Sequence, residues 1–138
     1  MNKKIFIASD HAGYKMKTAL NNHFPTFIDL GTNSFDSVDY PDFAHKLTNE
    51  ILKNEGSCGI LICGTGVGMS IAANRLEGIR AGLVSSVEVT RLIRQHNDAN
   101  VLVIPGRFME VEEARNCAQT FIDTQFEAGR HKQRIEKI

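Results

Sequence analysis

The sequence has few cysteines, no net charge and no long hydrophobic segment. Its 138 residues include only three cysteines, an odd number that makes no disulfide framework and fits a reducing compartment. Sixteen lysines and arginines balance 16 aspartates and glutamates, whereas a non-specific nucleic-acid binder normally carries a basic excess. No segment approaches the roughly 20 apolar residues that span a bilayer. We therefore expect neither a nucleic-acid partner nor a membrane partner.

The N-terminus starts basic and then turns apolar, as a secretory signal does. The apolar run stops at Asp10 and His11 after about five residues, which is too short for a signal. We therefore expect a soluble, cytoplasmic protein. At 42% apolar residues, a chain of this length can bury a core without disulfides, and no linker or low-complexity stretch divides it. The expectation is a single domain over residues 1–138.

Short apolar runs alternate along the chain with segments of helical spacing. Four of the runs lack the polar-apolar alternation of a half-exposed strand, which is typical of strands covered on both faces. They are residues 5–8, 59–63, 81–84 and 101–104, with 26–30 as a weaker fifth candidate. Helical spacing joins Ala44, Leu47 and Ile51, and again Val111, Ala114, Ala118, Phe121 and Ile122. This order predicts an α/β fold, a Rossmann-like three-layer αβα sandwich with a five-stranded parallel sheet.

Local signals agree with two of the expected helix starts. In Asp39-Tyr40-Pro41 the proline falls where the first helical N–H groups are unpaired anyway. Ser85-Ser86-Val87-Glu88 has the spacing of a capping box. The tail, residues 129–138, differs from the rest because four of its ten residues are lysine or arginine.

The segment after residues 59–63 is the most informative for function, because ligands of open α/β sheets bind beyond the carboxyl ends of the strands. It reads Cys63-Gly64-Thr65-Gly66-Val67-Gly68. Alternating glycines let the backbone turn tightly and aim N–H groups inward, and a helix beginning near Gly68 adds its positive end. This pattern predicts an anion cradle whose dipoles favour the thiolate of Cys63, a usable base or nucleophile. Cys58 and Cys117 are expected to be small buried hydrophobes.

Several known phosphate loops do not fit this segment. A Walker A loop requires Gly-Lys-Ser/Thr, whereas the sequence has Gly68-Met69-Ser70. A cysteine phosphatase loop requires an arginine at the position of Met69. A dinucleotide fingerprint would follow the first strand, not a later one. These comparisons argue against nucleotide hydrolysis, phosphoryl transfer to Cys63 and dinucleotide binding.

Other polar residues have two readings from the residues alone. Asp10-His11 closes a turn or contributes to a site, and His96 caps a helix or acts as a general acid or base. Arg130 and Arg134, four apart, share one helical face suited to a phosphate, or are simply solvated. His23 and His45 are expected at the surface. No pair of histidines and acids has metal-ligand spacing, so we expect no metal site.

Together these motifs resemble the ribose-5-phosphate isomerase B family over nearly the whole chain. The matching segments are Ser9-Asp10-His11-Ala12-Gly13, Asp39-Tyr40-Pro41, Gly59 to Gly68, Gln95-His96-Asn97-Asp98 and Gly129-Arg130-His131. The resemblance implies a homodimer or homotetramer that interconverts D-ribose 5-phosphate and D-ribulose 5-phosphate through an enediolate, in the pentose phosphate pathway, without metal or cofactor. It also implies that the tail, residues 129–138, completes a phosphate site.

The resemblance implies a role for each matching residue. Cys63 corresponds to the base that moves a proton between C1 and C2 of the sugar, and Thr65 assists proton shuttling. His96 corresponds to the group that opens the furanose ring. The amides around the developing enediolate belong to Gly64, Thr65, Gly66, Val67 and Gly68.

Further matching residues hold the substrate. Asp10 and Asn97 contact sugar hydroxyls or the opening ring, and Tyr40 lies near the ring. In the family the site is shared, with the equivalents of His96, Asn97 and Arg107 reaching over from the partner subunit. The side chains around the phosphate correspond to His11, Arg107, Arg130 and Arg134.

Within the family, Cys63 and Met69 indicate the cysteine-type branch, because the other branch places a glutamate where Met69 stands. Related galactose-6-phosphate isomerase subunits each lack part of the site, which this chain retains. Two alternatives stay open: isomerisation of a six-carbon aldose phosphate such as allose or galactose 6-phosphate, and a non-catalytic sensor that binds a sugar phosphate.

Overall fold

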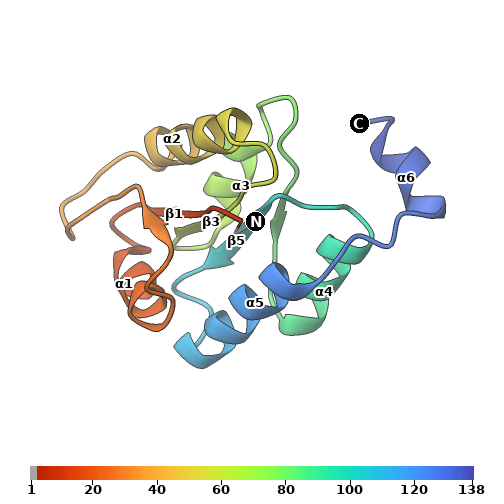
Figure 1. The fold of residues 1–138 in the computed structure, drawn as a ribbon. Coiled ribbons are helices and arrows are strands. Elements are labelled where there is room, and N and C mark those ends of the chain that lie inside the picture. The colour runs from red at the N-terminus through yellow and green to blue at the C-terminus, as the bar shows by residue number, and fades with distance from the viewer. Residues whose placement is uncertain (1–2) are drawn as a thin grey trace.

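The computed structural model describes residues 3–138, so the first two residues of the basic N-terminus lie outside it. Five parallel strands form one sheet in the order β2-β1-β3-β5-β4 (Figure 1). This confirms the predicted parallel α/β sandwich. The strands are β1 (Ile5–Ser9), β2 (Ile28–Asp29), β3 (Cys58–Cys63), β4 (Ala81–Leu83) and β5 (Val101–Pro105). The helices are α1 (Tyr14–His23), α2 (Tyr40–Lys53), α3 (Val67–Ala73), α4 (Val87–Gln95), α5 (Val111–Asp123) and α6 (Arg130–Ile135).

Two hydrophobic cores lie on opposite faces of the sheet. Ile60 and Ile62 of β3 point to the core with α1, α4 and α5, while Leu61 and Cys63 point to the core with α2 and α3. Every residue of β3 and β5 is buried, which explains why these runs show no alternation. The same expectation is wrong for β4. It is an edge strand paired only with β5, and its Leu83 is 37% exposed.

Helices α2 and α4 begin near the residues that the local signals predict, and the N-cap of α4 is shifted by one residue. Asp39 is the N-cap of α2 and Pro41 lies in its first turn, as predicted. The capping-box prediction for α4 is wrong by one residue. Ser86, not Ser85, is the N-cap, because its hydroxyl accepts a hydrogen bond from the Val89 N–H at 3.2 Å. Glu88 then lies in the first turn, where its charge complements the helix dipole.

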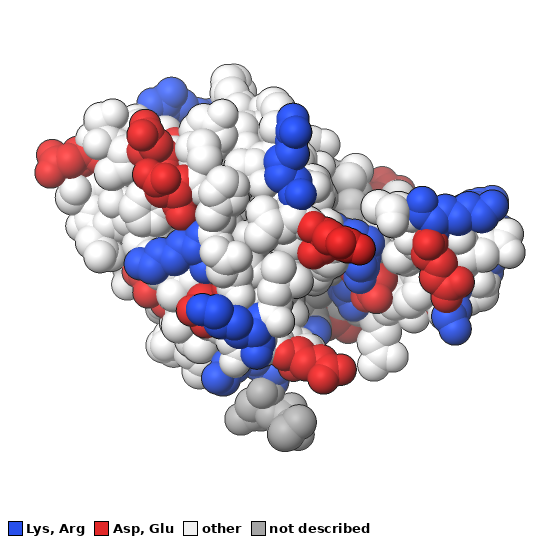
Figure 2. All heavy atoms as spheres, turned by 90° about the horizontal axis from the view of Figure 1, so that it is seen from above, with Lys and Arg blue, Asp and Glu red and all other residues white. Residues whose placement is uncertain are grey.

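The surface carries charges of both signs. On the face shown in Figure 2, blue and red side chains are interspersed among uncharged ones. Helix α6 stands to one side of the sheet, beyond α4 (Figure 1). Among residues 3–138, no helix is long and apolar enough to cross a membrane.

An ion pair between a buried lysine and an exposed aspartate ties α1 to the end of β2. The Lys17 side chain is 2% exposed, and its Nζ lies 2.8 Å and 2.7 Å from the two oxygens of Asp29. Asp29 Oδ1 also accepts the Gly31 N–H at 2.9 Å. Gly31 and Thr32 in turn exchange backbone hydrogen bonds with Ser9 at the end of β1. The ion pair therefore holds the segment after β2 against the strand that leads to Asp10.

We predict that Asp29→Ala destabilises the fold by about 3 kcal/mol, because it leaves a buried ammonium without a counter-charge. Urea denaturation followed by circular dichroism measures the change. Lys53→Ala is the control, since Lys53 and Glu50 form an exposed pair at 4.0 Å, and we expect a loss under about 1 kcal/mol. Equal losses for the two variants would contradict the role given to the Lys17–Asp29 pair.

Candidate functional site

The polar segments after β1 and β3 meet at the point where the strand order reverses. After β1 the chain continues to β2 on one side, and after β3 it continues toward β4 and β5 on the other side. The junction of β1 and β3 is therefore the switch point at which α/β proteins bind ligands. Gly13 lies directly on β3, because a Cβ at this position would come 2.5 Å from the carbonyl oxygen of Ile62. The Asp10 N–H donates to the same oxygen at 3.2 Å. This contact brings Asp10 and His11 beside Cys63.

A cavity of about 250 Å³ opens at this junction, and we call it the cysteine cavity. Cys63 ends β3 and is 5% exposed, yet its side chain lines the cavity. Arg107 contacts the loop that follows Cys63. Its N–H donates to the Gly64 carbonyl at 3.0 Å, and its side chain lies 3.3 Å from where a Gly64 Cβ would be. The lining residues are Asp10, His11, Ala12, Tyr40, Cys63, Gly64, Thr65, Gly68 and Arg107.

The glycines of the loop after Cys63 are required by close packing. Gly66 caps α3 with φ +79°, and a Cβ there would collide with the Leu83 side chain of β4. A Cβ on Gly68 would lie 2.6 Å from the Tyr40 ring. Thr65 Oγ1 accepts the Val67 N–H at 3.2 Å, which steadies the turn into α3. The loop therefore approaches β4 and α2 with bare backbone.

Asp10 and His11 serve the turn and the cavity together. Asp10 is 6% exposed, and its Oδ1 accepts the Gly13 N–H at 3.0 Å while the carboxylate lines the cavity. His11 Nδ1 accepts the Val38 N–H at 3.2 Å. A nitrogen that accepts a hydrogen bond carries no proton, so the neutral ring holds its proton on Nε2. The two readings of this pair are therefore compatible.

A second cavity, of about 240 Å³, lies between the end of α4 and the tail; we call it the histidine cavity. His96 caps the C-terminus of α4, as its position in the sequence predicts. The His131 ring stacks on it, with centroids 4.2 Å apart and planes inclined by 17°. The lining residues are His96, Asn97, His131, Arg134, Ile135 and Ile138.

Glu127 connects the two histidines of this cavity. Its Oε1 lies 3.8 Å from the Nε2 atoms of both His96 and His131. His131 is 8% exposed, and burial lowers the pKa of its ring, helped by the neighbouring charges of His96 and Arg130. Glu127 belongs to no recognisable motif. The one signal that could have identified it is its spacing of four residues from His131. The sequence reading missed Glu127 and assigned no role to His131.

The expectation that no histidine and acid pair has metal-ligand spacing is wrong. Donor atoms of His96, Glu127 and His131 all lie within 4.8 Å of one another. The tail brings Glu127 and His131 to His96, and this long-range contact is invisible in the local pattern. The remaining histidine predictions are confirmed, because His23 and His45 are exposed.

The two cavities divide the predicted site residues between them. Among residues 3–138, no residue lines both the cysteine cavity and the histidine cavity. The structure brings Arg107 to Cys63 of the same chain, so the expectation that Arg107 reaches over from a partner is wrong. Arg107 lies two residues after the end of β5, which pairs with β3. The tail is helical over Arg130–Ile135, the condition under which Arg130 and Arg134 share a face. Arg130 is exposed at the start of this helix and does not line the histidine cavity.

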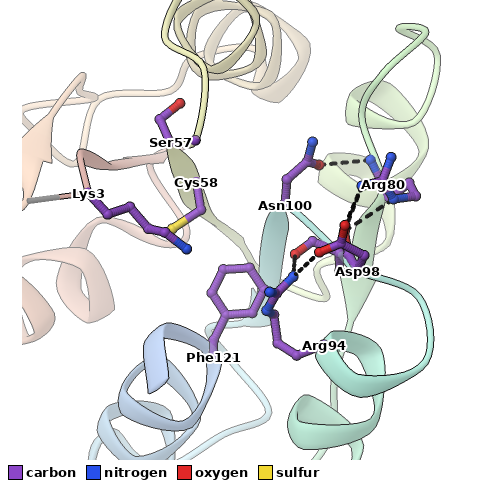
Figure 3. Close-up of a pocket in the computed structure, with 10 residues that line it drawn as sticks. Lys3, Ser57, Cys58, Arg80, Arg94, Asp98, Asn100 and Phe121 are labelled. Atoms are coloured by element: carbon purple, nitrogen blue, oxygen red, sulfur yellow. Dashed lines mark hydrogen bonds and ion pairs between the residues drawn. The ribbon is translucent and has the colours of Figure 1, made fainter. Parts of the chain in front are cut away.

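A third cavity, of about 270 Å³, lies at the opposite end of the sheet, near the start of β3 and β5 (Figure 3). Its arginines are already engaged, since Arg80 and Arg94 bind Asp98 and backbone carbonyl oxygens. Burial raises the pKa of the Cys58 thiol there, and likewise that of Cys117 in α5. Both residues are buried, as predicted, and their raised pKa values suit packing rather than chemistry.

Comparisons with known proteins match the whole of this architecture. A family model described as Ribose/Galactose Isomerase covers residues 5–138. Ribose-5-phosphate isomerase B of Escherichia coli is 42% identical over 99% of this chain and 94% of its own length. A crystal structure of a ribose 5-phosphate isomerase from Thermotoga maritima is 50% identical, with a TM-score of 0.95 over 99% of this chain and 97% of that one.

A third relative was solved with a ligand. Ribose-5-phosphate isomerase B from Mycoplasma genitalium, with bound ribulose-5-phosphate, is 45% identical and has a TM-score of 0.95 over 99% of this chain and 94% of that one. Sequence, fold and length therefore agree in one assignment. The chain belongs to the ribose/galactose isomerase family.

Proposed function

We propose that this protein interconverts D-ribose 5-phosphate and D-ribulose 5-phosphate through an enediolate, as a step of the pentose phosphate pathway. The observation that carries the proposal is the Cys63 side chain, which lines a cavity together with Asp10, Thr65 and Arg107. The names of relatives that are 42 to 50% identical over nearly the whole chain support the five-carbon substrate rather than a six-carbon one.

Cys63 is the base of the proton transfer between carbons. Its thiolate removes the proton from C2 of the open aldose. The electron pair of the C2–H bond forms the C1–C2 double bond, and the π pair of the C1 carbonyl moves onto O1, which gives the enediolate. The thiol then returns the proton to C1, while Thr65 passes the O2 proton to O1. The product is the ketose, and the thiolate is regenerated. Having Cys63 as base assigns the chain to the cysteine-type branch.

The backbone amides of Gly64 to Gly68 stabilise the oxyanion of the enediolate. Bare glycine backbone at Gly66 and Gly68 packs against Leu83 and Tyr40, so the loop keeps its shape during the reaction. Fixed dipoles need no reorganisation as the charge develops, and one oxyanion donor contributes about 3 kcal/mol of barrier lowering in known enzymes.

The phosphate is held away from the reacting carbons, so its binding energy orients C1 and C2 against Cys63. His11 offers its Nε2 proton, since its Nδ1 accepts from Val38. Arg107 contributes a guanidinium from the same cavity. Arg130 and Arg134 of the tail complete the phosphate site, because guanidinium forks grip phosphate with paired hydrogen bonds. Asp10 and Asn97 bind the sugar hydroxyls, and Tyr40 borders the ring.

The working unit is a homodimer or a larger symmetric homomer with sites shared between subunits. The separation of the two cavities in one chain supports this, because His96, Asn97 and Arg134 line the histidine cavity and not the cysteine cavity, where Cys63 lies. Exposed apolar side chains also surround the edge strand β4 and offer a surface for a second copy. They are Val67, Ile71, Leu83 and Leu92.

His96 opens the furanose ring before proton transfer. The C1–O4 bond breaks with its electron pair moving to O4, which takes a proton from His96. The C1 hydroxyl loses its proton to Asp10, and that electron pair completes the aldehyde. His96 of one subunit thereby acts on substrate bound beside the partner's Cys63.

Two broader assignments accompany this function. The chain works as one domain, residues 1–138, with the tail at 129–138 serving the phosphate site. The three free cysteines suit the reducing cytoplasm, where we place the protein.

We predict that Cys63→Ala lowers the rate of isomerisation of ribose 5-phosphate by about 100-fold or more, because the carbon base is lost. Deuterium incorporation at C1 of ribulose 5-phosphate in D₂O falls with it. Cys58→Ala is the matched control, since it removes a buried thiol far from the cavity and leaves kcat unchanged. Near-parental activity of Cys63→Ala would reject Cys63 as the base.

The shared site predicts complementation between two inactive variants. When Cys63→Ala and His96→Ala subunits are mixed and exchanged in equal amounts, half of the dimers are mixed and each contains one intact site. Activity should therefore return to about one quarter of the parental value. Mass spectrometry of the intact dimers verifies exchange. Full exchange without recovery would exclude a site built from both subunits.

The mechanism above uses only side chains and backbone amides, so we predict that no metal ion is required. Dialysis against EDTA should leave kcat for ribose 5-phosphate within about twofold of its starting value. Elemental analysis before and after dialysis monitors removal. A loss of activity that a divalent ion restores would show that the cluster of His96, Glu127 and His131 serves as a metal centre.

A further inference from the structure

Glu127 and His131 form a cluster with His96 that the proposed chemistry does not yet use. The chain returns to the end of α4 after α5, where the Glu127 N–H donates to the Gln95 carbonyl at 3.1 Å. This hydrogen bond sets the Glu127 carboxylate beside His96. The next turn of chain brings the His131 ring face to face with the imidazole of His96, 4.2 Å away.

Strained backbone lies on both sides of this cluster. Among the described residues, Asp98 and Ala128 are the two that combine a side chain with a positive φ, of 46° and 59°. Asp98 follows the His96-Asn97 pair, and Ala128 lies between Glu127 and His131. Strain of this kind persists where surrounding contacts enforce it and gathers at functional sites.

The contacts that enforce the strained turn at Asp98 are visible in Figure 3. Arg94 NH1 lies 2.9 Å from Asp98 Oδ1, and Arg80 NH2 lies 2.8 Å from the Asp98 carbonyl. Arg80 Nε also donates to the Asn97 carbonyl at 3.0 Å. The two arginines, which line the third cavity, therefore hold the turn that follows His96 and Asn97 in place.

The two rings differ in burial and in the charges that lie beside them. Burial lowers the pKa of His131, and the nearby cations Arg130 and Arg134 act in the same direction. The His96 side chain is 38% exposed, against 10% for His131, so its charged form keeps more hydration. The Glu127 carboxylate lies 3.8 Å from the Nε2 atoms of both histidines, and its negative charge attracts a proton to this pair of rings.

We infer that Glu127 and His131 are positioning residues for His96, with Glu127 holding the proton on His96 and His131 fixing the plane of its ring. This inference rests on the proposed function, because it gives His96 the role of acid in ring opening. Glu127 keeps on His96 the proton that His96 then gives to O4. The ring-opening step itself is the one described above, with no further proton or electron pair. His131 stays neutral throughout.

The orientation of the rings favours a proton over a metal ion as the occupant of this cluster. A metal ion lies in the plane of each imidazole that binds it. Two rings stacked at 17° cannot both direct a nitrogen lone pair at one ion without turning apart. A proton needs only one of the two nitrogens and leaves the stack intact.

The test separates ring opening from proton transfer at carbon. Ribose 5-phosphate closes into a furanose, whereas ribulose 5-phosphate has no free hydroxyl at C5 and stays open. We expect Glu127→Gln to lower kcat for ribose 5-phosphate by about tenfold. Deuterium exchange at C1 of ribulose 5-phosphate in D₂O should stay within about twofold of the parent. Glu112→Gln, the same change at an exposed residue of α5, should alter neither rate.

Two further readouts distinguish positioning from general stability. Without the Glu127 carboxylate, a proton on His96 loses its neighbouring counter-charge, so the alkaline limb of the kcat profile for ribose 5-phosphate should move to lower pH. His131→Ala should reproduce the loss on ribose 5-phosphate, and His131→Phe, flat and neutral, should restore it to within about threefold.

The possible failures are distinct. The inference is overturned if Glu127→Gln leaves turnover of ribose 5-phosphate and its pH profile unchanged. It is also overturned if both the ring-opening reaction and C1 exchange fall together, since that would indicate a general defect. If the parental protein catalyses neither reaction, the proposed function itself fails.

Discussion

The close contact between the turn after β1 and the backbone of β3 is the constraint on which the site depends. Gly13 rests on the Ile62 carbonyl group at a distance that leaves no room for a side chain. Parallel pairing of Ser9 with Ile62 aligns the two strand ends, so that Asp10 and Cys63 emerge side by side. A carboxylate and a thiol from distant parts of the chain therefore share one small cavity.

Other contacts extend this alignment outward. The ion pair of the buried Lys17 with Asp29 holds Gly31 and Thr32 against Ser9. The segment that follows ends at Val38, whose N–H donates to His11. On the opposite side, Tyr40 lies against the bare backbone of Gly68. The polar groups of the cysteine cavity are therefore held by hydrogen bonds and packing that originate in the sheet and its helices.

The histidine cavity depends on a different kind of contact. Its members come from the end of α4 and from the tail, and they meet through the stack of His96 on His131 rather than through the sheet. Helix α6 stands apart from the layered body (Figure 1), which leaves this cavity facing outward. In the proposed shared site, the histidine cavity of one chain meets the cysteine cavity of its partner.

The sequence by itself determined the strands, the start of α2 and most members of the cysteine cavity. Uninterrupted apolar runs mark strands buried on both faces, and parallel strands carry the residues that follow them to one edge of the sheet. Short-range patterns suffice for such features, because each depends on neighbouring residues and on the sheet rule. The sequence did not predict the exposure of β4 or the N-cap at Ser86. An edge position in the sheet and a shift of one residue change the local residue pattern too little to be recognised.

Only the tertiary structure decided which polar residues meet. Glu127 and His131 approach His96 because the chain after α5 folds back to hydrogen-bond with Gln95, and a contact over some 30 residues has no local signature. Arg107 joins Cys63 of its own chain because β5 pairs with β3. The physical reason is the same in both cases: propensity and periodicity act along the chain, whereas the convergence of charged groups depends on how packed elements close in space.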